Sequence, residues 1–371
     1  METLQQSVEE LASLNFDAHA PIEGSGKSTG TRSSTPPSPG EELPLTSVTL
    51  LLQQVRQSLC GTEAELHLSP VNVNRLIDVV QILDKLPFEA RKDVTLIFNQ
   101  LVKRNYGEVV DMIAERFEPV VTRLVRGYKN PDTALLCGSM LRECIHYEKL
   151  ALALLNSDLL WLFFDKYAHQ TNFEVALDAI STLCDLLTHK CAAQFLQAKY
   201  GIFFRRYEML LLSSNHVTRL RSFKLLGELL LDRANFNVMI KYISSRHNLK
   251  VAMNALRDKS PSIQVEAFHV FKIFAANPKK SSEIVDILIK NKAKLVTFLE
   301  ALPIEKDDVQ FCKERRLLVA TITALEPEDK LDLAEACTKG GDSYSTCSTS
   351  SCGDSSTFSS WAVDAPLLPK L

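Results

Sequence analysis

Four stretches of this sequence repeat one pattern, and this repetition limits the possible folds more than any other feature. The stretches read DTALLCGSMLRECI from Asp132, EVALDAISTLCDLL from Glu174, VTRLRSFKLLGELL from Val217 and SIQVEAFHVFKIFA from Ser262. Their starts are 42, 43 and 45 residues apart. A period of about 40 to 47 residues is typical of armadillo and HEAT arrays, which build each repeat from two or three helices.

Equivalent positions of the four stretches agree in character. One position is always small: Cys137, Ala179, Ser222 and Ala267. Two others, six residues apart, are always apolar: Leu135, Leu177, Leu220 and Val265, then Leu141, Leu183, Leu226 and Phe271. Small residues let neighbouring helices approach closely, and apolar residues at helical spacing predict a buried stripe.

Helix-breaking residues fall just before or after the repeated stretches. They are Asn130-Pro131, Ser213-Ser214-Asn215, Lys259-Ser260-Pro261 and Asn277-Pro278. Ser260 before Pro261 predicts an N-cap with proline at the first helical position. Because no convincing run of alternating strands is present, the pattern predicts an all-α, right-handed, armadillo/HEAT-like helical repeat solenoid with a concave groove.

Composition changes at both ends of the chain. Residues 1–44 are rich in Ser and Pro and are expected to be mostly disordered, because such sequence cannot bury a core. The Ser/Thr-rich tail, residues 334–371, is expected to be disordered for the same reason. The helical repeat domain is therefore predicted to span residues 45–333.

Charge and hydropathy exclude several classes of partner. The 42 Lys and Arg and 45 Asp and Glu residues give a formal net charge of -3, so nothing predicts nucleic-acid binding. The longest apolar stretch, 151–164, is interrupted by Asn156, Ser157 and Asp158, which argues against membrane insertion. The first 14 residues lack the basic end and apolar centre of a secretory signal, so the expected location is cytoplasmic.

The nine cysteines do not form a zinc or redox motif, since no C-x-x-C pair is present. Four of them, Cys137, Cys144, Cys184 and Cys191, lie inside helical patterns and are expected to be reduced core residues. No metal and no cofactor are predicted.

The motif GSGKST, Gly24 to Thr29, resembles the end of a phosphate-binding loop. The complete loop needs a glycine where Pro21 stands, and it needs a strand before it and a helix after it. We therefore interpret the motif as part of a linker. Because no histidine belongs to a recognisable catalytic signature either, the sequence predicts a protein that is not an enzyme.

Basic and aromatic residues are concentrated in the last two of the four repeats. The stretch holds Arg219, Arg221, Lys224, Arg233, Phe236, Lys241, Tyr242, Lys250 and Met253, followed by Lys272, Lys279, Lys280 and Lys290. One interpretation is a solvated outer face. The other is a groove that binds an acidic peptide with aromatic side chains.

Longer stretches of the chain resemble a known family. They are FKLLGELLLDRANFNVMIKYIS from Phe223, NLKVAMNALRDKSPSIQVEAFHVFKIFAANPKK from Asn248, RKDVTLIFNQLVKR from Arg91 and LVRGYKNPDTALLCGSMLRECI from Leu124. They closely resemble the mouse-protein-twenty-five scaffold family, also called calcium-binding protein thirty-nine, over about residues 50–325. The resemblance implies a non-catalytic, monomeric armadillo-like scaffold that binds and activates protein kinases of the sterile-twenty type, or a related pseudokinase together with a kinase.

The resemblance also implies two contact surfaces. A pocket for the partner's Trp-x-Phe tail matches Met253, Lys250, Lys224 and Lys290, with Leu220 and Arg221 at the position that meets the tail's acid. A groove that contacts the kinase fold matches Arg233, Phe236 and Phe173.

This chain departs from the family pattern at the tail pocket. The family has an arginine where the sequence Thr218-Arg219-Leu220-Arg221 places Leu220, and a leucine cannot pair with a carboxylate. The pocket is thus expected either to have changed its preference or to use Arg221. The alternative function is a general armadillo-type peptide-binding adaptor that does not activate kinases.

Overall fold

The computed structural model describes residues 49, 52–53, 55–56, 74, 77–104, 108–302 and 309–326. Helices form the body of this part of the chain, as the repeat pattern predicted. The first are η1 (Val79–Lys85), α4 (Phe88–Lys103), α5 (Val109–Glu115), α6 (Phe117–Gly127), α7 (Pro131–Ile145), α8 (Glu148–Leu155), α9 (Leu159–Asp165), η3 (Tyr167–His169) and α10 (Phe173–Leu187). They are followed by α11 (Ala192–Ala198), α12 (Tyr200–Leu211), α13 (His216–Leu231), η4 (Arg233–Asn235), α14 (Phe236–Ile243), α15 (Arg246–Leu256), α16 (Pro261–Ala276), α17 (Ser282–Lys290), α18 (Lys292–Glu300) and α19 (Val309–Thr323).

The repeats are three-helix units of the armadillo type. Two shorter helices lead in each case to a helix of 15 or 16 residues, and the four repeated stretches of sequence are the long helices α7, α10, α13 and α16. The predicted ends of the chain and the GSGKST motif lie outside the described residues.

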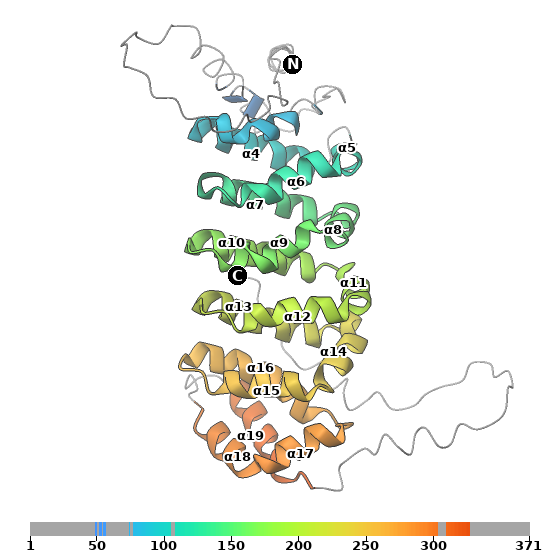
Figure 1. Cartoon of the computed structure of the whole chain (residues 1–371), viewed down its shortest axis with the longest axis vertical. Coiled ribbons are helices and arrows are strands. Elements are labelled where there is room, and N and C mark those ends of the chain that lie inside the picture. The colour runs from blue at the N-terminus through green and yellow to red at the C-terminus, as the bar shows by residue number, and fades with distance from the viewer. Residues whose placement is uncertain are drawn as a thin grey trace, which may run out of the picture. The chain divides into compact units, whose positions relative to one another are not determined.

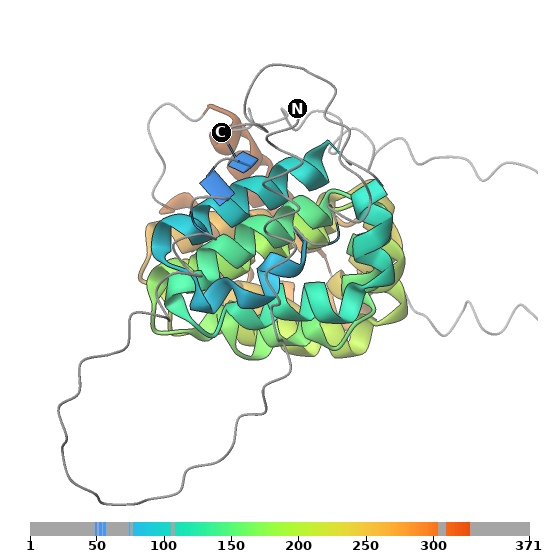
Figure 2. The same ribbon diagram turned by 90° about the horizontal axis from the view of Figure 1, so that it is seen from above.

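The chain forms two compact units. Unit 1 contains the described residues up to Phe195 together with Phe204–Thr218, and unit 2 contains Leu196–Phe203 and the residues from Arg219 on. In unit 1 the long helices α4, α7 and α10 pack in succession, and α5 and α8 lie at one side of them (Figures 1 and 2). In unit 2, α16 packs between α15 and α19, and α18 covers α19 (Figure 1).

The repeated small position lies where the long helices pack. Cys137, Ala179, Ser222 and Ala267 are all at most 1% exposed, which confirms the prediction of close helix approach. The second apolar row, Leu141, Leu183, Leu226 and Phe271, is buried as well.

The first apolar row was predicted to be buried, and this was wrong. Leu135 is 41% exposed, and Leu177, Leu220 and Val265 are only half-buried. In α7 the same stripe continues through half-buried Ser139 and Arg142, which bond to Asn99 of α4 and to Asp178 of α10. A helix has several stripes at this spacing, and the neighbouring helices cover the stripe with Leu135 less completely than the stripe with Leu141.

Asparagine caps begin three of the long helices. The side chain of Asn130 accepts a hydrogen bond from the backbone N–H of Asp132, Asn172 accepts from Glu174 and Val175, and Asn215 accepts from Val217 and Thr218. Each cap satisfies backbone donors that an α-helix leaves unpaired at its start. Ser260 is the N-cap residue of α16 and Pro261 is its first residue, as predicted, but the Ser260 side chain makes no capping bond.

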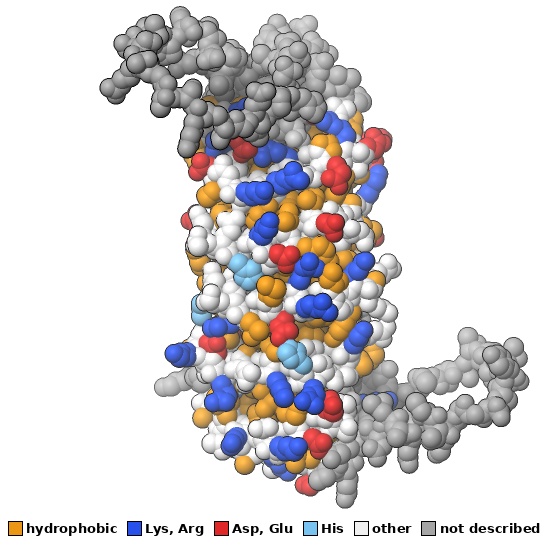
Figure 3. All heavy atoms as spheres, viewed as in Figure 1, with side chains coloured by type: hydrophobic (Ala, Val, Ile, Leu, Met, Phe, Trp, Pro, Cys, Tyr) orange, Lys and Arg blue, Asp and Glu red, His pale blue; other side chains and the backbone are white. Residues whose placement is uncertain are grey.

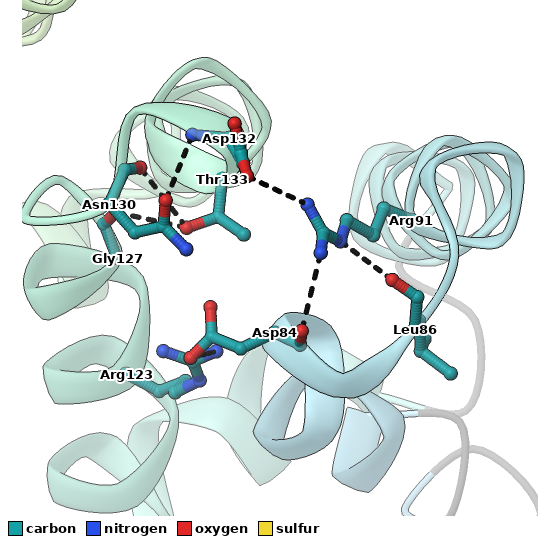
Figure 4. Close-up of polar contacts among 8 residues, drawn as sticks. All are labelled: Asp84, Leu86, Arg91, Arg123, Gly127, Asn130, Asp132 and Thr133. Atoms are coloured by element: carbon teal, nitrogen blue, oxygen red, sulfur yellow. Dashed lines mark hydrogen bonds and ion pairs between the residues drawn. The ribbon is translucent and has the colours of Figure 1, made fainter.

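Polar contacts also fix the first described repeat of unit 1 (Figure 4). The guanidinium of Arg91 donates to the backbone oxygens of Leu86 and Asp84, at 2.8 and 3.2 Å. Its Nη1 lies 4.0 Å from the carboxylate of Asp132, at the start of α7, while Asp84 pairs with Arg123 of α6 at 2.6 Å. These contacts join η1, α4, α6 and α7.

The cysteine prediction is confirmed for three of its four members. Cys137, Cys144 and Cys191 are buried, whereas Cys184 is half-buried. All four carry reduced thiols. Burial raises the pKa of Cys137 and of Cys144 to about 12, so both thiols stay protonated near neutral pH.

Candidate functional site

The residues predicted for the tail pocket lie on three helices of unit 2. The long helix α13 carries Leu220, Arg221 and Lys224, of which Leu220 is half-buried and the two cations are exposed. Leu220 belongs to the outward apolar row, and Lys224 lies one turn after it on the same face of the helix.

The remaining pocket residues lie on helices α15 and α17. Met253 is half-buried, and Lys250, one turn before it, is exposed. Lys290 is exposed at the last position of α17, and α17 packs against α15. The structure thus presents an apolar thioether side chain with cations on its own helix and on an adjoining one.

Glu266 of α16 is a member of this surface that the sequence reasoning missed. Burial raises the pKa of its carboxyl group, Lys224 and Arg221 nearby lower it, and Glu228 raises it. Arg221, the predicted substitute for the missing arginine, therefore lies in the field of a carboxylate of its own chain. A signal existed in the repeat register, because Asp178 holds the equivalent position of α10 and also meets an arginine.

Arg219 forms an ion pair within its own chain, so we do not assign it to the tail pocket. Its Nη2 pairs with Asp258 at 2.9 Å, and Asp258 accepts a hydrogen bond from the backbone N–H of Ser260. This pair joins α13 to the turn before α16. Two other lysines of this basic stretch are not available at the surface either. Lys272 pairs with Glu314 at 2.7 Å, and Lys280 is only 8% exposed.

The predicted kinase-contact residues of unit 2 lie on a short turn that hydrogen bonds stabilise. Asp232 accepts a hydrogen bond from the backbone N–H of Ala234, which fixes the 3-10 turn η4 that carries the exposed Arg233. Buried Asn235 donates to the backbone oxygen of Leu229 at 3.0 Å. Phe236 then begins α14 and is 53% exposed.

Two aliphatic residues close to Phe236 in the sequence are also exposed, and the sequence reasoning missed both. Ile240 lies one turn after Phe236 on α14 and is 37% exposed, and Leu231 at the end of α13 is 45% exposed. An uncovered aromatic ring with an aliphatic neighbour at i+4 is the pattern of a helix face that binds another protein.

Phe173 occupies a similar setting in unit 1. It is the first residue of α10, directly after the capping Asn172, and it is 51% exposed. Half-buried Leu177 follows it by one turn and belongs to the outward apolar row. Each unit thus carries one of the predicted aromatic contacts at a helix start. On the face of the molecule in Figure 3, apolar side chains lie between interspersed basic and acidic ones.

The whole chain has a net charge of -3, but one part of it is strongly basic. Residues 219–302 contain 15 Lys and Arg but only 7 Asp and Glu. All the predicted pocket residues and two of the three predicted groove residues lie in this part. A surface of this charge attracts acidic partners and excludes basic ones.

Unit 1 also has a hollow away from these surfaces. An open cleft of about 550 Å³ in unit 1 is lined by residues of α6 and of the α8–α9 connection, among them Phe117, Arg126 and Leu162, and it holds none of the predicted site residues. Within the described ranges no three His, Cys, Asp or Glu side chains are grouped as a metal site would need. No helix in that part of the chain is both long and apolar enough to cross a membrane.

Comparison with known proteins agrees with the resemblance of the sequence. The sequence model of the Mo25-like family matches residues 34–326. The chain is 45% identical to a mouse protein named calcium-binding protein 39-like, over 74% of this chain and 86% of that protein. It is 43% identical to the Mo25-like protein of Schizosaccharomyces pombe, over 75% of this chain and 88% of that protein. It is 47% identical to MO25-like protein 2 of Caenorhabditis elegans, over 68% of this chain and 76% of that protein.

Among solved structures, a designed armadillo repeat protein in complex with the peptide (KR)4 is similar to the chain with a TM-score of 0.43 and 15% identity, over 67% of this chain and 99% of that one. The family model covers most of the described helices, and the natural relatives are similar over most of their own length. The chain therefore belongs to the Mo25-like family.

Proposed function

We propose that this protein is a non-catalytic scaffold that binds a protein kinase or pseudokinase of the sterile-twenty type and activates it. The observation that carries the proposal is the pair of uncovered phenylalanines, Phe173 and Phe236, each at the start of a helix with an apolar side chain one turn further on. Exposed aromatic side chains beside an arginine are typical anchors of protein interfaces. We further propose that the scaffold is monomeric and acts in the cytoplasm.

Activation requires that the scaffold prefer one state of its partner. A surface that contacts a kinase only in its active conformation shifts the equilibrium by the difference between its affinities for the two states. A preference of about 2 kcal/mol shifts that equilibrium roughly thirtyfold. The short turn with Arg233 suits this task because its hydrogen bonds hold the contact residues in place before the partner binds.

The second proposed contact is a tail pocket at Met253. An adaptable thioether on α15, with Lys250 and Lys290 exposed on α15 and α17, suits an aromatic tail that also carries negative charge. Leu220 supplies no charge, and Glu266 lies beside Arg221 and Lys224. We therefore propose that the aromatic residues of the tail contribute most of the binding energy here, and that the acid contributes little.

The test is a paired measurement of binding and kinase activity on the full chain. Arg233→Ala and Phe236→Ala are expected to weaken binding of a sterile-twenty-type kinase domain at least tenfold and to abolish its activation, because truncated interface anchors typically cost about 2 kcal/mol or more. Met253→Ala is expected to weaken only a Trp-x-Phe peptide. Leu317→Ala on α19 is the matched control, since Leu317 is an exposed apolar residue, 48% exposed, outside both surfaces.

The same measurement separates the alternative function. A general peptide-binding adaptor would bind the peptide, and Met253→Ala would weaken that binding, but no kinase would change its activity. Unchanged kinase binding and activity in both Arg233→Ala and Phe236→Ala would contradict the proposed kinase contact.

A further inference from the structure

An apolar surface at the α13–α14 corner lacks any cover from the rest of the described chain. Over residues 219–302, all of which are described, the large apolar side chains that are exposed are Leu231, Phe236 and Ile240, with exposed fractions of 45, 53 and 37%. All three fall within ten residues of sequence, which we call the corner surface. Uncovered apolar groups gathered in one place favour an occupant, because covering them removes them from water.

The charge around the corner surface limits what the occupant can be. Arg233 is exposed between Leu231 and Phe236, and the carboxylate of its exposed neighbour Asp232 is bonded to the backbone N–H of Ala234. Over residues 219–302 the excess of basic over acidic residues is eight. A basic or neutral polar segment gains nothing from this field, whereas an acidic segment with aromatic side chains matches both the charge and the apolar area.

The chain itself contains such a segment near its C-terminus. Residues 341–369 include Asp342, Asp354 and Asp364 but no Lys or Arg. Within this acidic, Ser- and Thr-rich sequence, one short part is apolar: it reads FSSWAVDAPLL from Phe358 to Leu368. It offers two aromatic rings, several aliphatic side chains and an aspartate in eleven residues, and we call it the tail segment.

The tail segment is attached close enough to reach the corner surface. Helix α19 packs against α16, α16 against α15, and α15 against α14 (Figure 1). Three helix packings of about 10 Å each put the axes of α19 and α14 at most roughly 30 Å apart. Glu326 and Phe358 are 32 residues apart, and a chain of that length can span up to about 105 Å, so its length permits the contact.

From these observations we propose that the tail segment, Phe358–Leu368, docks on the corner surface of its own chain. This inference rests in part on the proposed function, because Arg233 and Phe236 are also the proposed kinase contacts. The docked tail then occupies a surface that the kinase also uses, so the kinase must displace it to bind there. A tether of this length gives an effective concentration on the order of 1 mM, so a segment with a weak intrinsic affinity still occupies the surface much of the time.

The experiment compares hydrogen exchange in the full-length chain with a full-length double variant, Phe358→Ser with Trp361→Ser. Amides of residues 231–241 are expected to exchange at least threefold faster in the variant, while the rest of unit 2 is unchanged. Tyr344→Ser is the matched control, since Tyr344 is an aromatic residue of the same tail outside the segment. A synthetic peptide of residues 354–371 is expected to restore slow exchange to the variant. Equal exchange in wild type and variant would overturn the inference.

Two further measurements identify the occupant and the surface it covers. Protection that grows with protein concentration, together with a dimer in sedimentation, would overturn docking within one chain in favour of a second copy. Phe236→Ser in the full-length chain should abolish the effect of the tail variant, and Leu317→Ser should not.

Failure of this inference is distinguishable from failure of the proposed function. Hydrogen exchange needs no kinase, so it tests the docking alone. Kinase binding that is fivefold tighter for the tail variant than for wild type is the expected sign of competition. If exchange changes but no kinase binds either protein, the docking stands and the proposed function fails.

Discussion

The phenol of Tyr128 donates a hydrogen bond of 2.6 Å to Oδ2 of Asp178, and the other oxygen of this carboxylate pairs with Arg142 at 2.8 Å. The hydroxyl of Thr182 completes the group, at 2.8 Å from the phenol oxygen and 2.9 Å from Arg142. The contact joins the end of α6 to the long helices α7 and α10 of unit 1. Burial and then the negative charge of Asp178 raise the pKa of Tyr128 well above its ordinary value.

Gly138 of α7 provides the space for this contact, so Gly138→Ala is expected to destabilise the protein. A Cβ at this position would overlap the carboxylate of Asp178 and the hydroxyl of Tyr128. Overpacking and the displaced hydrogen bond together should lower the free energy of unfolding by about 3 kcal/mol, measured by urea denaturation followed by circular dichroism. Gly201→Ala is the control, because a Cβ on this exposed residue of α12 meets nothing within 4 Å. It should stabilise by about 0.5 to 1 kcal/mol, and equal effects of the two substitutions would contradict the role given to Gly138.

Removing the charge of Asp178 should cost more than removing the phenol that binds it. Tyr128→Phe loses one hydrogen bond but leaves the carboxylate paired with Arg142, so a loss of about 1 kcal/mol is expected. Asp178→Asn leaves the partly buried Arg142 without its counter-charge and should cost about 2 to 3 kcal/mol. A double-mutant cycle measures the coupling between the two, and additive losses would show that the contact contributes nothing by itself.

Stability should fall at alkaline pH through the buried thiols. The pKa of Cys144 is raised from about 9 to about 12 by burial, so above pH 9 the unfolded chain loses a proton that the folded chain keeps. The stabilisation is thus complete below pH 9 and is lost as the pH rises towards 12, by about 1.4 kcal/mol per pH unit for this thiol.

Cys144→Ala tests that assignment. The variant starts less stable at pH 7 because it lacks the buried sulfur, but its stability should fall less steeply. Between pH 9 and 10.5 the difference between wild type and variant should shrink by about 2 kcal/mol, measured from urea midpoints across the pH range. Parallel curves for the two proteins would show that this thiol does not titrate as its burial implies.

Leu220→Arg should restore preference for an acidic tail. An arginine at this outward position of α13 can pair with a carboxylate, so a Trp-Glu-Phe peptide should bind roughly tenfold tighter while a Trp-Ala-Phe peptide binds as before. Fluorescence anisotropy with the two labelled peptides gives both affinities. Val265→Arg is the matched control, since Val265 holds the same repeat position on α16 and is also half-buried. Equal gains for both peptides, or for both variants, would indicate a general charge effect.

Several elements of the fold could be predicted because they depend on local sequence. The period of 42 to 45 residues located the long helices α7, α10, α13 and α16, and the small residue in each was correctly expected at a helix contact. The capping bonds of Asn130, Asn172 and Asn215 were also open to prediction, because an N-cap acts within three residues.

The contacts between repeats, in the core and at the candidate site, were less predictable, because they join distant parts of the chain. Tyr128 and Asp178 are 50 residues apart, and the effect of Arg221 and Lys224 on Glu266 crosses from one long helix to the next. A single sequence shows which of these residues are charged but not which helices approach each other. The family resemblance supplied the candidate positions, and the structure added Leu231, Ile240 and Glu266 to them.

The sequence by itself determined the helical repeat, its period and the small residues that let the long helices pack, since these follow from spacing along the chain. Only the tertiary structure decided which of two equally apolar rows is buried: Leu141 and its equivalents face neighbouring helices, whereas Leu135 and its equivalents remain at the surface. The physical reason is that a period of 3.6 residues fixes which side chains share a face of a helix, but the packing of the neighbouring helices determines which face is removed from water.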